Sequence, residues 1–274
     1  MGQKTNTNLL RLNLEKSNWK SKYYAKTYEE STLYLFKELE IKRYINRIFN
    51  IYGSTIHNFK FYYSESLVKI FISFYLTKKY FKMCNKKKRP FRKNFEFTEH
   101  LLESLGLFFK KTFSIFLIIQ NLNKSSSVKF NNKKLQVLKK ICFKLRKFAK
   151  IKSTKDFFLE SLNILIIVLK KKKTSKILSE FLSFQLKVLR KQNMFLSMIK
   201  QILQVLITSN VFSTKGVKVI IKGRLNGAPR ARTTTILLGT ISTQTFKANI
   251  NYNDNTAFTR NGTFGVKVWV QESH

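Results

Sequence analysis

The sequence predicts a folded protein of mixed α+β class, and three observations support this prediction. Apolar residues recur near helical spacing over residues 28–52, which predicts an amphipathic helix that Gly53 ends. Apolar and other residues alternate over residues 67–76 and again near the C-terminus, which predicts strands. Six of the nine glycines lie at position 216 or later, so turns between strands are expected to concentrate there.

After the first helix, the pattern predicts a small sheet with a second helix. Residues 56–63 and 67–76 are expected to form strands, the second with one apolar face. That face comprises Val68, Ile70, Ile72 and Phe74. An amphipathic helix is expected over residues 98–111 and a further strand over residues 113–119.

The middle of the chain, residues 124–215, combines helical periodicity with clustered lysines. It holds 22 basic residues and only three acids, Asp156, Glu160 and Glu180. Two predicted apolar helix faces consist of Leu135, Leu138, Ile141 and Leu145, and of Ile177, Phe181, Phe184 and Val188. Helices of this kind bury one face and leave a basic face for phosphate contacts.

The last segment is expected to form an antiparallel sheet with one apolar face. Three runs of alternating residues support this expectation. Their apolar positions are Val217, Val219 and Ile221; Phe246, Ala248 and Ile250; and Val266, Val268 and Val270.

The charge balance limits the partners of the protein. The 274 residues include 53 Lys and Arg against 14 Asp and Glu, a formal net charge of +39. A disordered basic tail would lack the apolar residues that form 43% of this chain. A folded protein with so much like charge repels itself unless a polyanion is close. Nucleic acid or an anionic membrane surface is therefore the expected partner.

The sequence offers little for catalysis, a metal or a cofactor. Phosphate-binding glycine loops, zinc-protease motifs and nucleophile elbows do not occur in it. Because carboxylates are scarce, a two-carboxylate hydrolase or a two-metal nuclease is poorly supported. We therefore expect that the protein is not an enzyme and that it binds no metal or cofactor. Cys84 and Cys142 lie far apart and predict neither a disulfide framework nor zinc.

A membrane span is not expected. The most apolar stretches, residues 113–119 and 157–169, are shorter than the roughly 20 residues that a spanning helix needs. The polar first residues do not resemble a secretion signal or a transit peptide.

Residues 78–93 contain nine basic residues and no acid. The cluster Lys86, Lys87, Lys88 and Arg89 is either a solvated loop or a phosphate-contacting loop, and the sequence favours neither interpretation.

Short segments at both ends of the chain carry a family resemblance. They include residues 1–6 (MGQKTN), 39–45 (LEIKRYI), 223–228 (GRLNGA) and 265–270 (GVKVWV). With them the chain resembles the universal small-subunit ribosomal protein S-three family, whereas its middle matches only in outline. The resemblance implies an N-terminal type II KH domain and a C-terminal α/β domain. It also implies binding to small-subunit rRNA in the head, near the mRNA entrance channel and the neighbouring proteins S-ten and S-fourteen.

On this basis we expect three parts: an N-terminal extension and KH-like domain over residues 1–123, a basic helical insertion over 124–176, and a C-terminal α/β domain with a mainly antiparallel sheet over 177–274. The KH-like domain is expected to be degenerate. A KH domain clamps single-stranded nucleic acid with a G-x-x-G turn, and no glycine lies between Lys78 and Phe97.

The family also places basic residues on a helix that assists in opening mRNA structure. The matching stretch is residues 184–203, where Leu196 and Ser197 stand in place of arginines, which leaves an unwinding role open. The RNA-contacting residues we expect are Lys4, Arg11, Lys86, Lys87, Lys88, Arg89, Arg190, Lys191, Lys200, Lys218, Lys222, Arg224, Arg230 and Arg232.

The expected function is a structural, rRNA-binding constituent of a mitochondrial small ribosomal subunit, encoded in the organelle. The Lys-, Asn-, Ile- and Phe-rich composition suits an A+T-rich genome, and a plastid ribosome is the second choice. Two alternatives remain open: a maturase-like RNA-processing factor outside the ribosome, and a membrane-surface protein held by its lysines.

Overall fold

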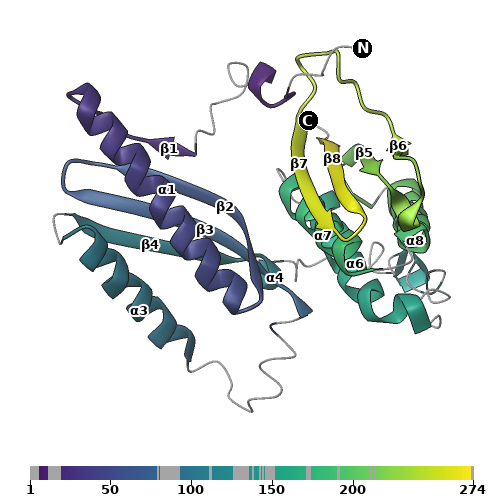
Figure 1. Cartoon of the computed structure of the whole chain (residues 1–274), viewed down its shortest axis with the longest axis horizontal. Coiled ribbons are helices and arrows are strands. Elements are labelled where there is room, and N and C mark those ends of the chain that lie inside the picture. Colours follow the sequence, from purple (N-terminus) through teal and green to yellow (C-terminus); the bar gives the residue numbers. More distant parts are fainter. Residues whose placement is uncertain are drawn as a thin grey trace. The chain divides into compact units, whose positions relative to one another are not determined.

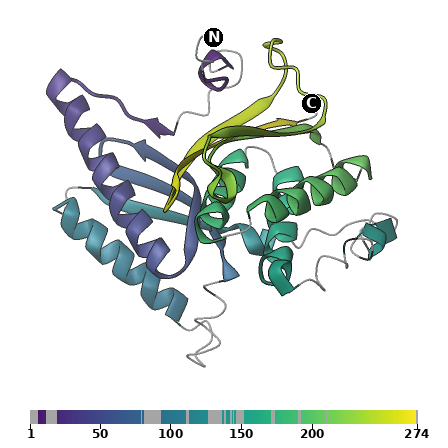
Figure 2. The same cartoon turned by 45° about the vertical axis from the view of Figure 1, so that its right-hand side comes forward.

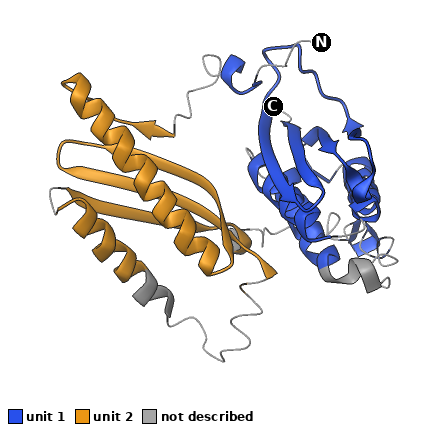
Figure 3. Cartoon of the chain, in the orientation of Figure 1, with its two compact units in different colours: residues 1–17, 129–274 blue, residues 18–128 orange. Residues whose placement is uncertain are grey.

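The structure, a computed structural model, describes most of the chain in several ranges. These are residues 6–11, 20–78, 80, 93–110, 113–125, 136–137, 139–141, 143, 145, 152–170, 174–189, 192–209, 211–212 and 214–272. The chain forms two units, residues 18–128 and residues 1–17 together with 129–274 (Figure 3). Residues 6–11 therefore group with the C-terminal half, whereas the first of the three predicted parts, residues 1–123, includes them; the three-part division itself stays a prediction.

The unit 18–128 contains a four-stranded sheet and two long helices (Figure 1). Its elements are β1 (Ser21–Lys22), α1 (Tyr28–Ile51), β2 (Ser54–Tyr63), β3 (Leu67–Leu76), α3 (Lys93–Phe108), β4 (Ser114–Asn121) and α4 (Leu122–Ser125). The strand order is β1-β2-β3-β4, with β2 and β3 antiparallel and β4 parallel to β3. The predicted strands are confirmed, and α3 begins five residues before the predicted helix.

Helix α1 has clear start and stop signals. The Thr27 hydroxyl accepts a hydrogen bond from the Glu30 backbone N–H, and the Glu30 carboxylate accepts one from the Lys26 N–H. Side chains thus satisfy amide groups that have no partner within the helix. Gly53, with φ +71°, lies just beyond the end. The predicted helix and its glycine stop are confirmed.

Both long helices lie on the same face of this sheet (Figures 1 and 2). The core between them and the strands is apolar and rich in Phe. Its buried members include Ile41, Ile45, Phe49, Phe59, Phe61, Val68, Ile70, Ile72, Leu101, Leu105 and Phe109. Three of the four residues of the predicted β3 face are thus fully buried, and Phe74 is partly buried against the same core.

The second unit contains another four-stranded sheet with helices on one face. Its elements are η1 (Leu9–Arg11), α6 (Lys152–Lys170), α7 (Ser175–Val188), α8 (Gln192–Thr208), β5 (Thr214–Gly223), η2 (Leu225–Gly227), β6 (Arg232–Gly239), β7 (Ile250–Thr259) and β8 (Gly262–Glu272). Helices α7 and α8 pack against the sheet, and α6 packs on these two helices (Figure 2). The strand order is β6-β5-β8-β7, and all neighbours are antiparallel. The α+β class and the antiparallel C-terminal sheet are confirmed.

Two details of this unit differ from the prediction. On α7, the predicted Ile177 and Phe181 are buried, but Phe184 and Val188 are exposed and Leu178, Leu182 and Leu186 are fully buried instead. Both sets of residues have helical spacing, and periodicity alone cannot tell where the buried face is centred. The expected strand at Phe246 is instead a loop over residues 240–249, and β7 begins at Ile250.

Candidate nucleic-acid interface

Four predicted contact residues gather where β5 ends and β6 begins. Gly223, the last residue of β5, pairs with Arg232, the first residue of β6. Residues 224–232, from the residue after Gly223 through Arg232, are here called the arginine loop. Arg224, Arg230 and Arg232 are exposed, and so is Lys222 beside them on β5. Among the residues that the structure describes, no carboxylate forms an ion pair with these four cations. Their guanidinium and ammonium groups are therefore available to an external anion.

The backbone of the arginine loop has a defined conformation. Asn226 has φ +55° and Gly227 has φ +77°, in the left-handed region that Asn and Gly tolerate best. Leu225 is buried, and Arg224 Nε donates a 2.7 Å hydrogen bond to the Ala228 carbonyl. Other Arg224 nitrogens remain for a phosphate.

The loop is attached to the start of α8 by two reciprocal hydrogen bonds. The Gln192 backbone N–H donates to Asn226 Oδ1 at 2.8 Å, and the Asn226 backbone N–H donates to Gln192 Oε1 at 2.9 Å. Gln192 Nε2 also donates to the Leu186 carbonyl at the end of α7. Gln192 is buried, so this anchor fixes the loop against both helices.

Substitution of Asn226 tests this anchor. Asn226→Ala should lower the free energy of unfolding by about 2 kcal/mol, because it removes an amide partner and puts a Cβ-bearing residue without a local hydrogen bond at positive φ. Asn226→Gly removes the same side-chain amide, but glycine adopts a positive φ without strain. About half of the decrease in the free energy of unfolding is therefore expected. Urea unfolding of the chain measures the free energy of unfolding of both variants. Equal losses for alanine and glycine would show that the positive φ at position 226 does not strain the alanine variant.

Arg11, a predicted RNA contact, has a different role in this structure. Its side chain is only 5% exposed. It donates to the carbonyls of Thr7, Thr243, Thr245 and Ala248 at 2.9–3.1 Å. Because the guanidinium is enclosed by backbone oxygens, it fastens the N-terminal segment to the loop 240–249 and does not present a surface charge. Arg11 is therefore not part of the interface, contrary to the prediction.

Asn8 makes a second connection from this segment. Its side chain donates to the Tyr252 carbonyl at 2.8 Å and accepts from the Tyr252 N–H at 3.0 Å. The Tyr252 ring packs on Trp269, with 5.0 Å between centroids, and Lys218 Nζ lies 5.6 Å from the Trp269 centroid.

The phenol of Tyr252 has a shifted pKa. Burial, and to a lesser extent Asp254, raises the pKa of Tyr252 to about 12. The phenol therefore stays neutral at physiological pH.

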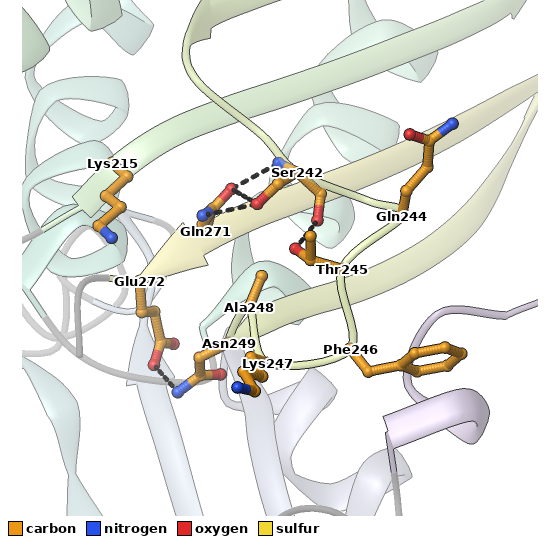
Figure 4. A pocket seen from close by; sticks show the side chains of 10 residues that line it. All are labelled: Lys215, Ser242, Gln244, Thr245, Phe246, Lys247, Ala248, Asn249, Gln271 and Glu272. Carbon is orange, nitrogen blue, oxygen red and sulfur yellow. Dashed lines mark hydrogen bonds between the residues drawn. The ribbon is translucent and has the colours of Figure 1, made fainter.

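The loop 240–249 borders a pocket of about 550 Å³ between it and the ends of β5 and β8 (Figure 4). Ser242 and Gln271 are hydrogen-bonded across one side, and Asn249 donates to Glu272 at 3.2 Å on the other. Glu272 is the one carboxylate among the ten lining residues, and the lining includes no His or Cys. This set offers polar contacts but no acid–base pair or nucleophile with a neighbouring base.

The remaining predicted contacts lie elsewhere. Lys200 is exposed on α8, two turns beyond Gln192, and Lys218 is half-buried in β5. Outside the described residues are Lys4, Lys86, Lys87, Lys88, Arg89, Arg190 and Lys191. Sequence reasoning missed Gln192, Asn226 and Asn8; only Asn226, which precedes a glycine, carried a local signal for a left-handed turn.

The described residues contain neither a metal-binding cluster nor a membrane-spanning helix. Within those residues there is no group of three or more His, Cys, Asp or Glu side chains placed to hold a metal ion. The described helices include none long and apolar enough to cross a membrane.

An exposed, rigidly attached cluster of arginines on a basic chain is typical of a nucleic-acid-binding protein. Comparison with known proteins specifies the class further. Residues 187–270, which contain α8, the arginine loop and nearly all of the sheet, match the family "Ribosomal protein S3, C-terminal domain".

Individual relatives agree with this match. The chain is 48% identical over 56 residues to small ribosomal subunit protein uS3 of Kosmotoga olearia, and 40% identical over 96 residues to uS3 of Endomicrobium trichonymphae. It is 47% identical over 60 residues to uS3c of Cyanidioschyzon merolae. These alignments cover 20%, 35% and 22% of this chain and 26%, 39% and 29% of the relatives. The chain thus spans between a quarter and two fifths of the length of these relatives.

Proposed function

We propose that this protein is a structural, RNA-binding constituent of a small ribosomal subunit and that it has no catalytic role. The observation that carries the proposal is the position of the arginine loop. It lies inside the segment that matches the S3 C-terminal domain, and its three arginines are exposed. Arg230 and Arg232 contact phosphates of small-subunit rRNA in this proposal, together with Arg224 and Lys222.

Lys200 and Lys218 are proposed as weaker contacts of the same kind, because a lysine acts as a point charge and carries no base code. We keep Lys4, the Lys86–Arg89 cluster, Arg190 and Lys191 as proposed contacts on the basis of sequence alone. Neighbouring head proteins and mRNA at the entrance channel are further proposed partners, by resemblance to the family.

We also propose that the unit 18–128 is a degenerate type II KH domain. Its elements β2, β3, α3 and β4 follow one another as the two strands, helix and strand expected of the KH-like domain do, and the segment between β3 and α3 contains no glycine. Without a G-x-x-G turn the backbone cannot approach phosphates as in other KH domains, so this unit would bind RNA by other means.

For the compartment we propose a mitochondrial ribosome, because of the A+T-like composition and the missing glycine turn. The relatives include uS3c proteins as well as bacterial ones, so a plastid ribosome is the alternative to test.

Sedimentation tests the proposed function. The tagged chain, expressed in its own cells, should move with small ribosomal subunits on sucrose gradients and should stay there after a moderate salt wash. Gradients of purified mitochondria and plastids distinguish the two compartments. A chain found free, or on large subunits only, would contradict the ribosomal role and favour a processing factor.

A further inference from the structure

The second face of the sheet in the unit 18–128 has an unusual composition. Strand residues alternate between faces, so the residues that follow the buried Phe59, Phe61, Val68 and Ile70 along β2 and β3 point away from α1 and α3. This second face carries Lys60, Tyr62, Lys69, Phe71, Phe116 and Ile118, and it is called the open face below.

Strand register places these six side chains in a regular pattern. In one row, Tyr62 of β2 pairs with Lys69 of β3, which pairs with Phe116 of β4. In the next row, Lys60 pairs with Phe71, which pairs with Ile118. Adjacent strands are about 4.8 Å apart, so each lysine has an aromatic ring as its direct neighbour.

Several of these apolar groups are exposed to solvent, which is costly unless a partner covers them. Phe116 is 53% exposed and Ile118 is 41% exposed, and Tyr62 and Phe71 are half-buried. Their neighbours Ile115 and Leu117, on the other face of β4, pack against the core. The exposure therefore belongs to one face of the strand and not to a poorly packed strand.

The charge of the open face indicates the kind of partner. The four strands β1 to β4 contain no Asp or Glu, and they contribute Lys22, Lys60 and Lys69. Lys22 Nζ lies 5.8 Å from the Tyr62 ring centroid. An apolar protein partner needs no lysines between the rings, whereas unpaired RNA offers bases that stack on aromatic rings and phosphates that lysines neutralise.

We propose that the open face is a binding platform for unpaired RNA. Phe116, Phe71 and Tyr62 stack on bases, and Lys22, Lys60 and Lys69 contact the intervening phosphates. The inference rests on the proposed RNA-binding function and adds a second RNA site, on a different unit from the arginine loop. It also gives this unit a way to hold RNA that does not need a glycine turn.

The test compares binding of the chain to a single-stranded oligouridine of about ten nucleotides and to an RNA duplex. Phe116→Ala should weaken binding to the oligouridine by about 5- to 30-fold, since one base–aromatic stack is worth about 1–2 kcal/mol. Binding to the duplex should not change. Phe116→Tyr keeps a ring and should bind like the unchanged chain. Phe108→Ala on α3, which is 42% exposed on the helical side of the same unit, is the matched control and should have no effect.

Charge gives an independent readout. Lys69→Ala should reduce the slope of log affinity against log salt for the oligouridine by about 0.7. Crosslinking of 4-thiouridine in the same oligonucleotide should label the peptide 113–121.

Unchanged oligouridine binding by Phe116→Ala, or labelling that avoids this peptide, would overturn the platform. If binding nevertheless fell on substitution of the arginine loop, the proposed function would stand and the open face would bind a protein instead. If the unchanged chain bound neither RNA, both proposals would fail.

Discussion

Replacing Arg11 with alanine is expected to lower the free energy of unfolding by about 2–3 kcal/mol. Four backbone carbonyls would lose a charged donor, and a nearly buried side chain would leave a void. The expected decrease is smaller than the sum of four buried hydrogen bonds, because the loop 240–249 is largely exposed and water can solvate its carbonyls in the variant. Denaturant unfolding of the chain, followed by circular dichroism, measures the change.

Two further variants make the Arg11 result specific. Arg11→Lys keeps the charge but cannot reach four carbonyls from one ammonium group, so it should recover less than half of the loss. Arg43→Ala removes an arginine whose side chain is 75% exposed and paired with Glu40, and it should change stability by less than about 1 kcal/mol. If Arg11→Ala were as mild as Arg43→Ala, the N-terminal segment would not be fastened as described.

Replacing Arg224, Arg230 and Arg232 together with alanine is expected to weaken binding to small-subunit rRNA about 100-fold. These three side chains are exposed and are not needed for the core, so the chain should keep its stability. Each lost phosphate contact also removes a counterion-release term. The slope of log affinity against log salt should therefore become less negative by about 2–3. Filter binding at several salt concentrations gives both quantities.

The matched control for the arginine loop keeps the charge. With lysine at the same three positions, the salt slope should stay near its original value and affinity should fall less, because lysine loses only the bidentate geometry. A triple alanine variant with an unchanged slope would show that the arginine loop is solvated and does not contact RNA.

Local signals made some elements predictable from sequence. Helix α1 has its own cap, an apolar stripe and a glycine stop, and β3 alternates clearly, so both follow from neighbouring residues. The buried face of α7 followed only in part, because its apolar residues lie on two adjacent stripes and packing against the sheet decides which of them are covered. Tertiary contacts therefore decide which apolar residues of a helix are buried when periodicity allows more than one face.

The candidate interface also has features that the sequence predicts and features that only the structure shows. The positive charge is visible in the sequence and indicated nucleic acid or an anionic membrane surface, and the family resemblance then implied rRNA. The role of Arg11 depends on carbonyls more than 230 positions away, and the anchor between Gln192 and Asn226 joins residues 34 positions apart. The open face requires the strand register, because only the pairing brings Lys69 beside Tyr62 and Phe116. None of these three sets of contacts can be predicted from composition or local sequence pattern.

The most direct test of the ribosomal role is protein–RNA crosslinking inside cells, followed by identification of both the crosslinked peptide and the RNA. We expect peptides that contain residues 224–232 to crosslink to small-subunit rRNA. Crosslinks of that segment to large-subunit rRNA, to messenger or intron RNA alone, or to no RNA would contradict this account.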